Sequence, residues 1–227
     1  MSVTLTIATF PSITFPDRAT ASLASFREWA HNNDLPEKTR TDYYKGEVLI
    51  DLSKEQLFTH GAVKTEIAAV LQTLCKQTSL GRYWCNGILV TNEDADLSTN
   101  PDGTFVSHAT LSAGTVTLTP GADGGFVEMV GTVDMGLEVV SDSSEKKDNH
   151  TLPLLEAYFE AGIPEYWIVD ARGEEIDFRI YKPGTKRYSL VKKQPGGWSK
   201  SVVFDKSFRL ARSLDASNNP EFTLEVK

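Results

Sequence analysis

Two short apolar runs bracket a helical segment in the second half of the sequence, and this pattern limits the possible folds more than any other feature. The runs are residues 137–140 (Leu-Glu-Val-Val) and 166–169 (Tyr-Trp-Ile-Val), and the segment between them has a helix stop at Gly162. Short apolar runs are typical of strands buried on both faces, and parallel neighbours need a crossover, usually a helix. The pattern therefore predicts a β-α-β unit in an α/β fold.

Glu138 interrupts the first of these apolar runs. An ionised carboxylate is costly to bury unless it is paired, hydrogen-bonded or bound to a metal. Asp102 offers a partner, because it lies in a Pro-Asp-Gly sequence just before a short β-rich run at 104–106. Two carboxylates from neighbouring strands are what a hard divalent cation such as Mg²⁺ requires. The alternative for Asp102 is a turn residue after Pro101.

Length and charge limit the organisation of the chain. It has 227 residues and a formal net charge of -8, with no sign of a second core. We expect a single domain over 1–227, with its core at about 40–182, an N-terminal β arm at 1–20 and C-terminal β-hairpins at 183–227. The negative charge argues against broad electrostatic binding to nucleic acid. Basic residues between Lys182 and Arg212 indicate either a solvated face or a local nucleic-acid patch.

The cysteines and the N-terminal residues bear on the compartment. Cys75 and Cys85 match neither a disulfide framework nor a zinc-ligand spacing. The first 30 residues have no basic region followed by an apolar run long enough for a signal peptide or a membrane span. We expect a soluble cytoplasmic protein without membrane association.

Periodicity predicts the other elements near the candidate site. We expect helices at 22–30 and 59–76, a hairpin at 43–52 with its turn at Lys45-Gly46, a strand at 83–91, and hairpins after Asp170. In the second helix Val63, Ile67, Val70, Leu71 and Leu74 share one face, and Lys64 is assigned mostly to the other side.

Several motifs together resemble one known family. They are Pro101-Asp102, residues 137–144, Lys147-Asp148, residues 158–170, Lys45-Gly46-Glu47 and His60 at the head of the helix. The sequence over roughly 23–215 is similar to the Uma-two type of endonuclease, a branch of the PD-(D/E)XK nuclease superfamily. The stretch 137–170 is its most specific part, since Pro-Asp alone is common.

The resemblance implies a fold, an activity and a site. The fold is restriction-endonuclease-like, with a mixed central sheet flanked by helices. The activity is Mg²⁺- or Mn²⁺-dependent hydrolysis of DNA phosphodiester bonds, in a homodimer. Asp102 and Glu138 would hold the ion with the backbone carbonyl of Val139, and Glu47 and His60 would complete the site. From the residues alone, Glu47 also suits a solvent-exposed strand face, and His60 also suits a helix cap.

The resemblance also implies a lysine that assists the attacking water. Its usual position, two residues after the strand glutamate, holds Val140, and another form of the pattern places it at Leu154. Lys147 takes the role in our interpretation, with Lys146 as the substitute.

Two rival functions stay open. A nuclease fold that has lost activity would serve as an interaction module. A metal-dependent hydrolase could instead act on a small phosphorylated molecule. Either would share the fold, so only substrate tests separate them.

Overall fold

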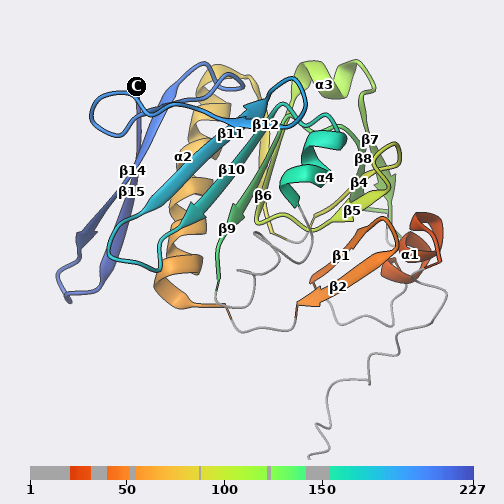
Figure 1. Cartoon of the computed structure of the whole chain (residues 1–227), viewed down its shortest axis with the longest axis horizontal. Helices are drawn as coiled ribbons and strands as arrows, with labels where there is room; N and C mark the ends of the chain where they lie inside the picture. Colours follow the sequence, from red (N-terminus) through yellow and green to blue (C-terminus); the bar gives the residue numbers. More distant parts are fainter. Residues whose placement is uncertain (1–20, 32–39, 52–54, 87, 122–123, 142–153) are drawn as a thin grey trace, which may run out of the picture.

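The computed structural model describes residues 21–31, 40–51, 55–86, 88–121, 124–141 and 154–227. The expected N-terminal arm at 1–20 and both loop lysines, Lys146 and Lys147, lie outside these ranges. The described residues form mixed β-sheets with a few helices (Figure 1). The predicted α/β class is confirmed, with two six-stranded mixed sheets where one central sheet was expected.

Sheet 1 is formed by strands from the first 131 residues. Its strands, in spatial order, are β2 (Glu47–Asp51), β1 (Arg40–Tyr44), β5 (Leu97–Thr99), β4 (Leu89–Asn92), β8 (Phe126–Gly131) and β7 (Val116–Pro120). The predicted hairpin is confirmed as β1–β2, and its turn residues Lys45 and Gly46 both have positive φ angles. β4 and β8 are parallel, while the other pairs are antiparallel.

Sheet 2 contains the predicted β-α-β unit. Its strands, in spatial order, are β12 (Tyr188–Leu190), β11 (Asp177–Pro183), β10 (Glu165–Asp170), β9 (Met135–Val139), β6 (Gly103–Ser107) and β3 (Gly81–Cys85). β9 and β10 are parallel, and α4 (Leu154–Glu160) lies between them in the chain. Gly162 follows α4 with a φ of +69°, a left-handed conformation that favours glycine.

The remaining strands form sheet 3 at the C-terminal end. It is antiparallel, in the order β13 (Ser199–Lys200), β14 (Ser207–Leu214) and β15 (Pro220–Val226). The helices before α4 are α1 (Leu23–Ala30), the π-helical turn η2 (Leu57–Ala62), α2 (Val63–Thr78) and α3 (His108–Ser112). Among the described residues, none of the helices is long and apolar enough to cross a membrane.

Both faces of sheet 2 are buried, which explains the apolar runs of the sequence. Leu137 and Trp167 belong to a core that contains α2 and sheet 3. Tyr166 and Ile168, on the other face, belong to a second core that contains α4 and parts of sheet 1. Sheet 2 is therefore the layer between the two cores, and Glu138 on β9 is only 2% exposed.

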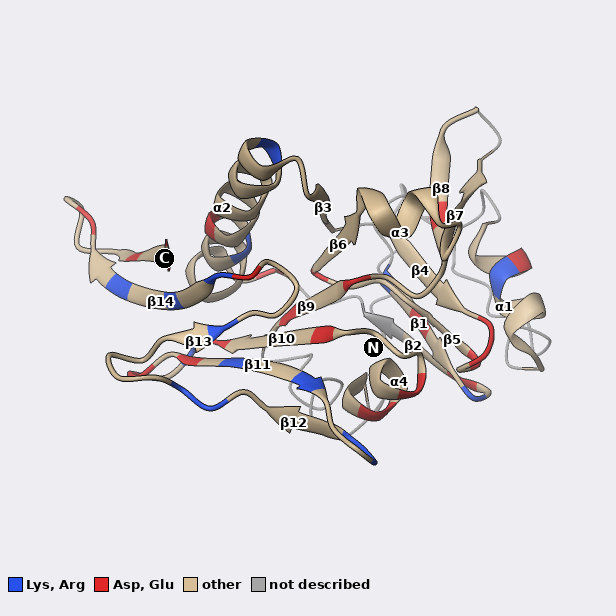
Figure 2. Cartoon of the chain, turned by 90° about the horizontal axis from the view of Figure 1, so that it is seen from above, with Lys and Arg blue, Asp and Glu red and all other residues tan. Residues whose placement is uncertain are grey.

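The basic residues of the C-terminal quarter lie on strands β11 to β14 and their loops, at one side of the molecule (Figure 2). Several are paired with acidic neighbours, including Lys200 with Asp205 and Arg209 with Glu225. Arg209 also lies over the ring of Trp198. These pairs favour the interpretation of a solvated face.

A buried ion pair attaches α1 to sheet 1. Arg27 of α1 donates from Nε and Nη2 to both oxygens of Glu128 on β8, at 2.8 and 2.9 Å. His31 and Thr91 also contact this carboxylate, whose side chain has no exposed surface. Burial raises the pKa of Glu128, but the hydrogen bonds from Arg27 and Thr91 outweigh it and lower the pKa to about 2.

We predict that Arg27→Met lowers the free energy of unfolding by about 3 kcal/mol, because it leaves the buried Glu128 carboxylate without its main counter-charge. Arg27 also pairs with Glu93, whose side chain is 65% exposed. Glu93→Gln is the matched control and should cost less than about 1 kcal/mol. Urea denaturation measures both. Equal losses would mean that the ion pair between Arg27 and Glu128 is not what holds α1 against sheet 1.

The Glu128 carboxylate also makes the free energy of unfolding depend on pH. Because the pKa of Glu128 is about 2 in the folded chain and 4.5 when unperturbed, its contribution is fully present above pH 4.5. The contribution is lost as the pH falls from 4.5 toward about 2. The difference in stability between the parent and Glu128→Gln should therefore shrink over this range. A difference that stays constant with pH would contradict the assignment.

Candidate active site

The pairing register of β6 and β9 brings Asp102 and Glu138 together. These strands are antiparallel with Gly103 opposite Leu137, so the next pair outward is Asp102 and Glu138. Their exposed fractions are only 1% and 2%. The structure thus places side by side the two carboxylates that the sequence analysis pairs.

Local packing explains the Pro-Asp-Gly sequence at this point. A Cβ atom on Gly103 would lie 1.9 Å from the hydroxyl oxygen of Tyr83, so only glycine fits there. On the other side, the backbone N–H of Asn86 donates to the carbonyl of Asp102 at 3.1 Å. Asn86 has a left-handed φ of 52°. Asp102 is therefore held by backbone on a strand end and is not a free turn residue.

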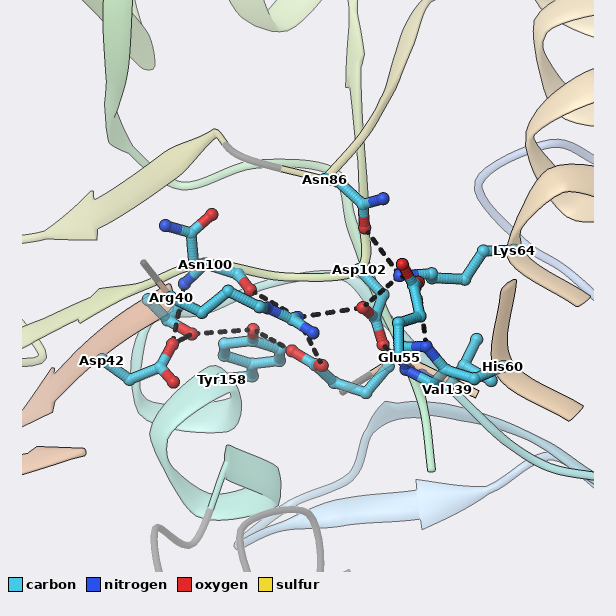
Figure 3. Close-up of polar contacts among 12 residues, drawn as sticks. Arg40, Asp42, Glu55, His60, Lys64, Asn86, Asn100, Asp102, Val139 and Tyr158 are labelled. Atoms are coloured by element: carbon cyan, nitrogen blue, oxygen red, sulfur yellow. Dashed lines mark hydrogen bonds and ion pairs between the residues drawn. The ribbon is translucent and has the colours of Figure 1, made fainter. Parts of the chain in front are cut away.

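Three cationic or basic side chains surround the Asp102 carboxylate (Figure 3). Arg40 Nη2 lies 2.9 Å and Lys64 Nζ 3.4 Å from Oδ1, and His60 Nε2 lies 3.3 Å from Oδ2 without hydrogen-bond alignment. The backbone N–H of Val139 donates to Oδ2 at 2.8 Å. Burial raises the pKa of Asp102, but Arg40, His60 and Lys64 outweigh it and hold the pKa well below its usual range. The carboxylate is therefore ionised.

Glu138 shares one of these cations. Its Oε2 lies 4.0 Å from Arg40 Nη2, the same nitrogen that contacts Asp102. The hydroxyl of Tyr158, on α4, donates to Oε1 at 3.2 Å. Burial and the nearby Glu138 carboxylate raise the pKa of Tyr158 well above its ordinary value. Tyr158 therefore keeps its proton, and its hydroxyl can position Glu138 by donating a hydrogen bond to it.

The turn before α2 supplies the other side of the cluster. Glu55 accepts from His60 Nδ1 at 3.1 Å and also pairs with Lys64. His60 and Lys64 are one helical turn apart, so their side chains lie on the same face and reach Asp102 together. Lys64 also donates to the Asn86 side chain at 3.1 Å.

A buried polar layer supports Arg40 from sheet 1. Asp42, two residues further along β1, is fully buried and accepts from Thr99 Oγ1 and from the Asn100 backbone N–H, both at 2.8 Å. Arg40 donates to the Asn100 carbonyl at 3.0 Å. The β1–β5 edge is thereby joined to the segment that carries Asp102.

The structure brings together some of the residues chosen from sequence and separates others. His60 and the backbone N–H of Val139 contact Asp102, and Glu138 lies beside them. The role of the Val139 carbonyl as an ion ligand stays a prediction. Lys147 lies outside the described residues. Glu47 does not join the described cluster, because it is exposed and pairs with Tyr44 at the far end of the hairpin, about 13 Å along β1 from Arg40.

Sequence reasoning missed four charged members of the cluster: Arg40, Asp42, Glu55 and Lys64. For Lys64 a signal existed. It lies three, seven and eleven positions before Ile67, Leu71 and Cys75, on the buried stripe of α2, and the structure corrects its assignment to the opposite side. Only 7% of its side chain is exposed. Arg40 and Asp42 gave no local signal, because their partners follow from the pairing of β1 with β5.

The donor chemistry at Asp102 and Glu138 fits a hard divalent ion. Two carboxylates meet at one cationic nitrogen, that of Arg40, which marks where a positive charge is stabilised. Among the described residues, no group of three or more His, Cys, Asp and Glu side chains is arranged as a metal site. Mg²⁺ commonly uses one or two carboxylates and keeps several waters. The pair therefore fits such an ion if the ion replaces the guanidinium.

A comparison with family models decides the relationship. The model named Uma2, with the description "Putative restriction endonuclease", matches residues 23–213. The chain belongs to the Uma2 family. The match runs from α1 into β14, so every described member of the Uma2 chain's carboxylate cluster lies within it. Membership in Uma2 points to a nuclease, which is a hydrolase. No curated protein matches the chain.

We predict that Arg40→Met in this Uma2 protein lowers the free energy of unfolding by about 3 kcal/mol in EDTA, because two buried carboxylates lose a shared counter-charge. Arg82, exposed on β3, provides the matched control, and Arg82→Met should stay within about 0.5 kcal/mol of the parent. Denaturant titrations at pH 7 compare the variants. If Arg40→Met matches Arg82→Met, Arg40 is not what stabilises the carboxylate pair.

Proposed function

We propose that this protein is a Mg²⁺- or Mn²⁺-dependent endonuclease that hydrolyses DNA phosphodiester bonds. One observation carries the proposal: Asp102 and Glu138, from adjacent strands, lie within 4.0 Å of a single guanidinium nitrogen. Two buried carboxylates gain nothing for stability from this proximity unless a cation joins them. Membership in the Uma2 family supports the choice of a nuclease among metal-dependent hydrolases.

Asp102 and Glu138 would hold the ion, together with the backbone carbonyl of Val139. A bound divalent ion polarises a phosphoryl oxygen and lowers the pKa of its water. The chain itself positions the ligands. The Val139 N–H fixes one oxygen of Asp102, and the Tyr158 hydroxyl fixes one oxygen of Glu138.

His60 acts as a positioning residue in this proposal. Its Nδ1 contacts Glu55, which orients the ring, and its Nε2 lies against Asp102. His60 thereby keeps the Asp102 carboxylate turned toward Glu138. Roles for Glu47 and Lys147 stay predictions from the family resemblance. Glu47 would have to act on distant parts of the substrate, because it is exposed on β2.

One observation favours an inactive interaction module instead. Arg40 already neutralises the carboxylates that an ion would need, and the ion must compete with it. Metal binding separates the two functions only in part, so the cleavage assay decides between them. Cleavage of single-stranded DNA, double-stranded DNA, RNA and bis(p-nitrophenyl) phosphate with Mg²⁺ and Mn²⁺ then separates a nuclease from a small-molecule hydrolase.

The proposal includes a homodimer, because two copies related by a two-fold axis would present two sites to the two strands of a duplex. Sedimentation of the full chain with and without duplex DNA measures this part independently of cleavage.

We predict that Asp102→Ala and Glu138→Ala each weaken Mn²⁺ binding about tenfold or more and abolish cleavage, because one carboxylate leaves the ion mainly with water ligands. Asp205→Ala is the control, since its side chain is 91% exposed on a distant loop. Titration calorimetry measures affinity, and an oligonucleotide assay measures cleavage. Parental Mn²⁺ affinity in both carboxylate variants would remove the proposed ion site.

A further inference from the structure

Lys64 is a buried cation on a helix face that is otherwise apolar. It is the second residue of α2, and its side chain is only 7% exposed. Its neighbours on that face, Ile67 and Leu71, are fully buried. Burying an ammonium costs several kcal/mol unless its partners compensate, and its long stem has entropy to lose as well. Such a position needs a reason beyond the packing of α2.

The partners of Lys64 hold its ammonium in one place. Nζ contacts the carboxylate of Glu55, the side-chain oxygen of Asn86 and Oδ1 of Asp102. A lysine ammonium has three N–H donors, so the three acceptors match its capacity. Glu55 lies just before η2, Asn86 directly follows β3, and Asp102 directly precedes β6. The ammonium is thus fixed relative to the strand that carries Asp102.

Arg40 and Lys64 contact the same oxygen of Asp102 but differ in what they can do. They lie on opposite sides of Asp102 in the view of Figure 3. Arg40 also reaches Glu138 and so occupies the point between the carboxylates. Lys64 contacts Asp102 from the α2 side and need not move when an ion replaces the guanidinium. Its compact charge would then lie beside the ion's ligand.

Other described positions on sheet 2 and α4 do not supply an ammonium here. Val140 follows Glu138 by two residues and Leu154 begins α4, and both are fully buried aliphatic side chains. Among the described residues, Lys64 is the lysine in contact with Asp102.

We propose that Lys64 is the catalytic ammonium of this site, which rests on the proposed nuclease function. In the hydrolysis, a water oxygen bonds to phosphorus while the bond from phosphorus to the leaving sugar oxygen breaks. The water proton passes to solvent, and the leaving oxygen takes up a proton from solvent. Lys64 transfers no proton in this step. It keeps its contacts with Glu55 and Asn86 and redirects the donor that faces Asp102 to a non-bridging phosphoryl oxygen, where negative charge grows. Glu55 and Asn86 position it.

The test combines cleavage with two measurements that do not need turnover. Lys64→Met should reduce cleavage about 100-fold, as expected for loss of one donor to the transition state. Mn²⁺ affinity should stay equal or increase, because a positive charge near the ion is removed. Lys76→Met is the control on the exposed face of α2, and Lys147→Met tests the alternative lysine. Thermal melts report folding.

Each outcome has a definite meaning. Loss of cleavage in folded Lys64→Met with Mn²⁺ affinity retained, and near-parental cleavage in Lys147→Met, supports the proposal. Parental cleavage in Lys64→Met overturns it while leaving the nuclease function intact. A parent that cleaves none of the nucleic acids overturns both, because no reaction remains for Lys64 to assist.

Two further variants keep the proposal testable if Lys64→Met does not fold. Lys64→Arg retains the charge and its ion pairs, so a purely structural role predicts parental cleavage. A compact ammonium that must reach one point predicts a loss of at least about tenfold. Added ethylamine should restore part of the cleavage in Lys64→Ala and none in Asp102→Ala. Parental activity in Lys64→Arg together with no amine rescue would overturn the assignment.

Discussion

The structure depends on how it stabilises two carboxylates that are buried side by side where β6 meets β9. The antiparallel register of β6 and β9 places Asp102 opposite Glu138, and both residues are almost fully buried, where electrostatic interactions are strong. Arg40 from β1 and Lys64 from α2 form ion pairs with Asp102 from two different parts of the fold. The same electrostatic demand therefore joins sheet 1, α2 and sheet 2, and it determines where a site can form.

This arrangement sets stability and function against each other. Replacing the carboxylates by apolar residues would relieve desolvation, as is common for buried ion pairs. The proposed ion site would account for charged side chains at this place. The Arg27–Glu128 pair differs, because that carboxylate is saturated by Arg27, His31 and Thr91 and serves only to attach α1. Glu165 is likewise satisfied, by Trp167, Ser201 and backbone N–H groups. In the described part of the chain, the Asp102 cluster differs from both, because two buried carboxylates there share the guanidinium of Arg40.

Much of the fold near the site could be predicted from local patterns. The apolar runs on β9 and β10, the stop at Gly162 and the Lys45-Gly46 turn each depend on neighbouring residues, and all appear in the structure. Sheet 1 did not follow from the sequence as a separate sheet, because β5 and β7 are short or partly polar and are defined by partners far along the chain. The site residues, too, could be predicted only where their signals are local. Asp102, Glu138 and His60 have local signals, whereas Arg40 and Asp42 become part of the cluster only when β1 pairs with β5.

Periodicity and short motifs are enough to predict the β-α-β unit, the α/β class and the family, because each of these depends on residues close together in the sequence. The sequence by itself also determined that Glu138 requires a partner, since a charge within an apolar strand carries that demand wherever the strand lies. Which cations contact the carboxylates follows from the tertiary structure. Lys64 and Arg40 reach Asp102, and Glu47 does not, because long-range strand pairing and the docking of α2 set distances that no local pattern encodes.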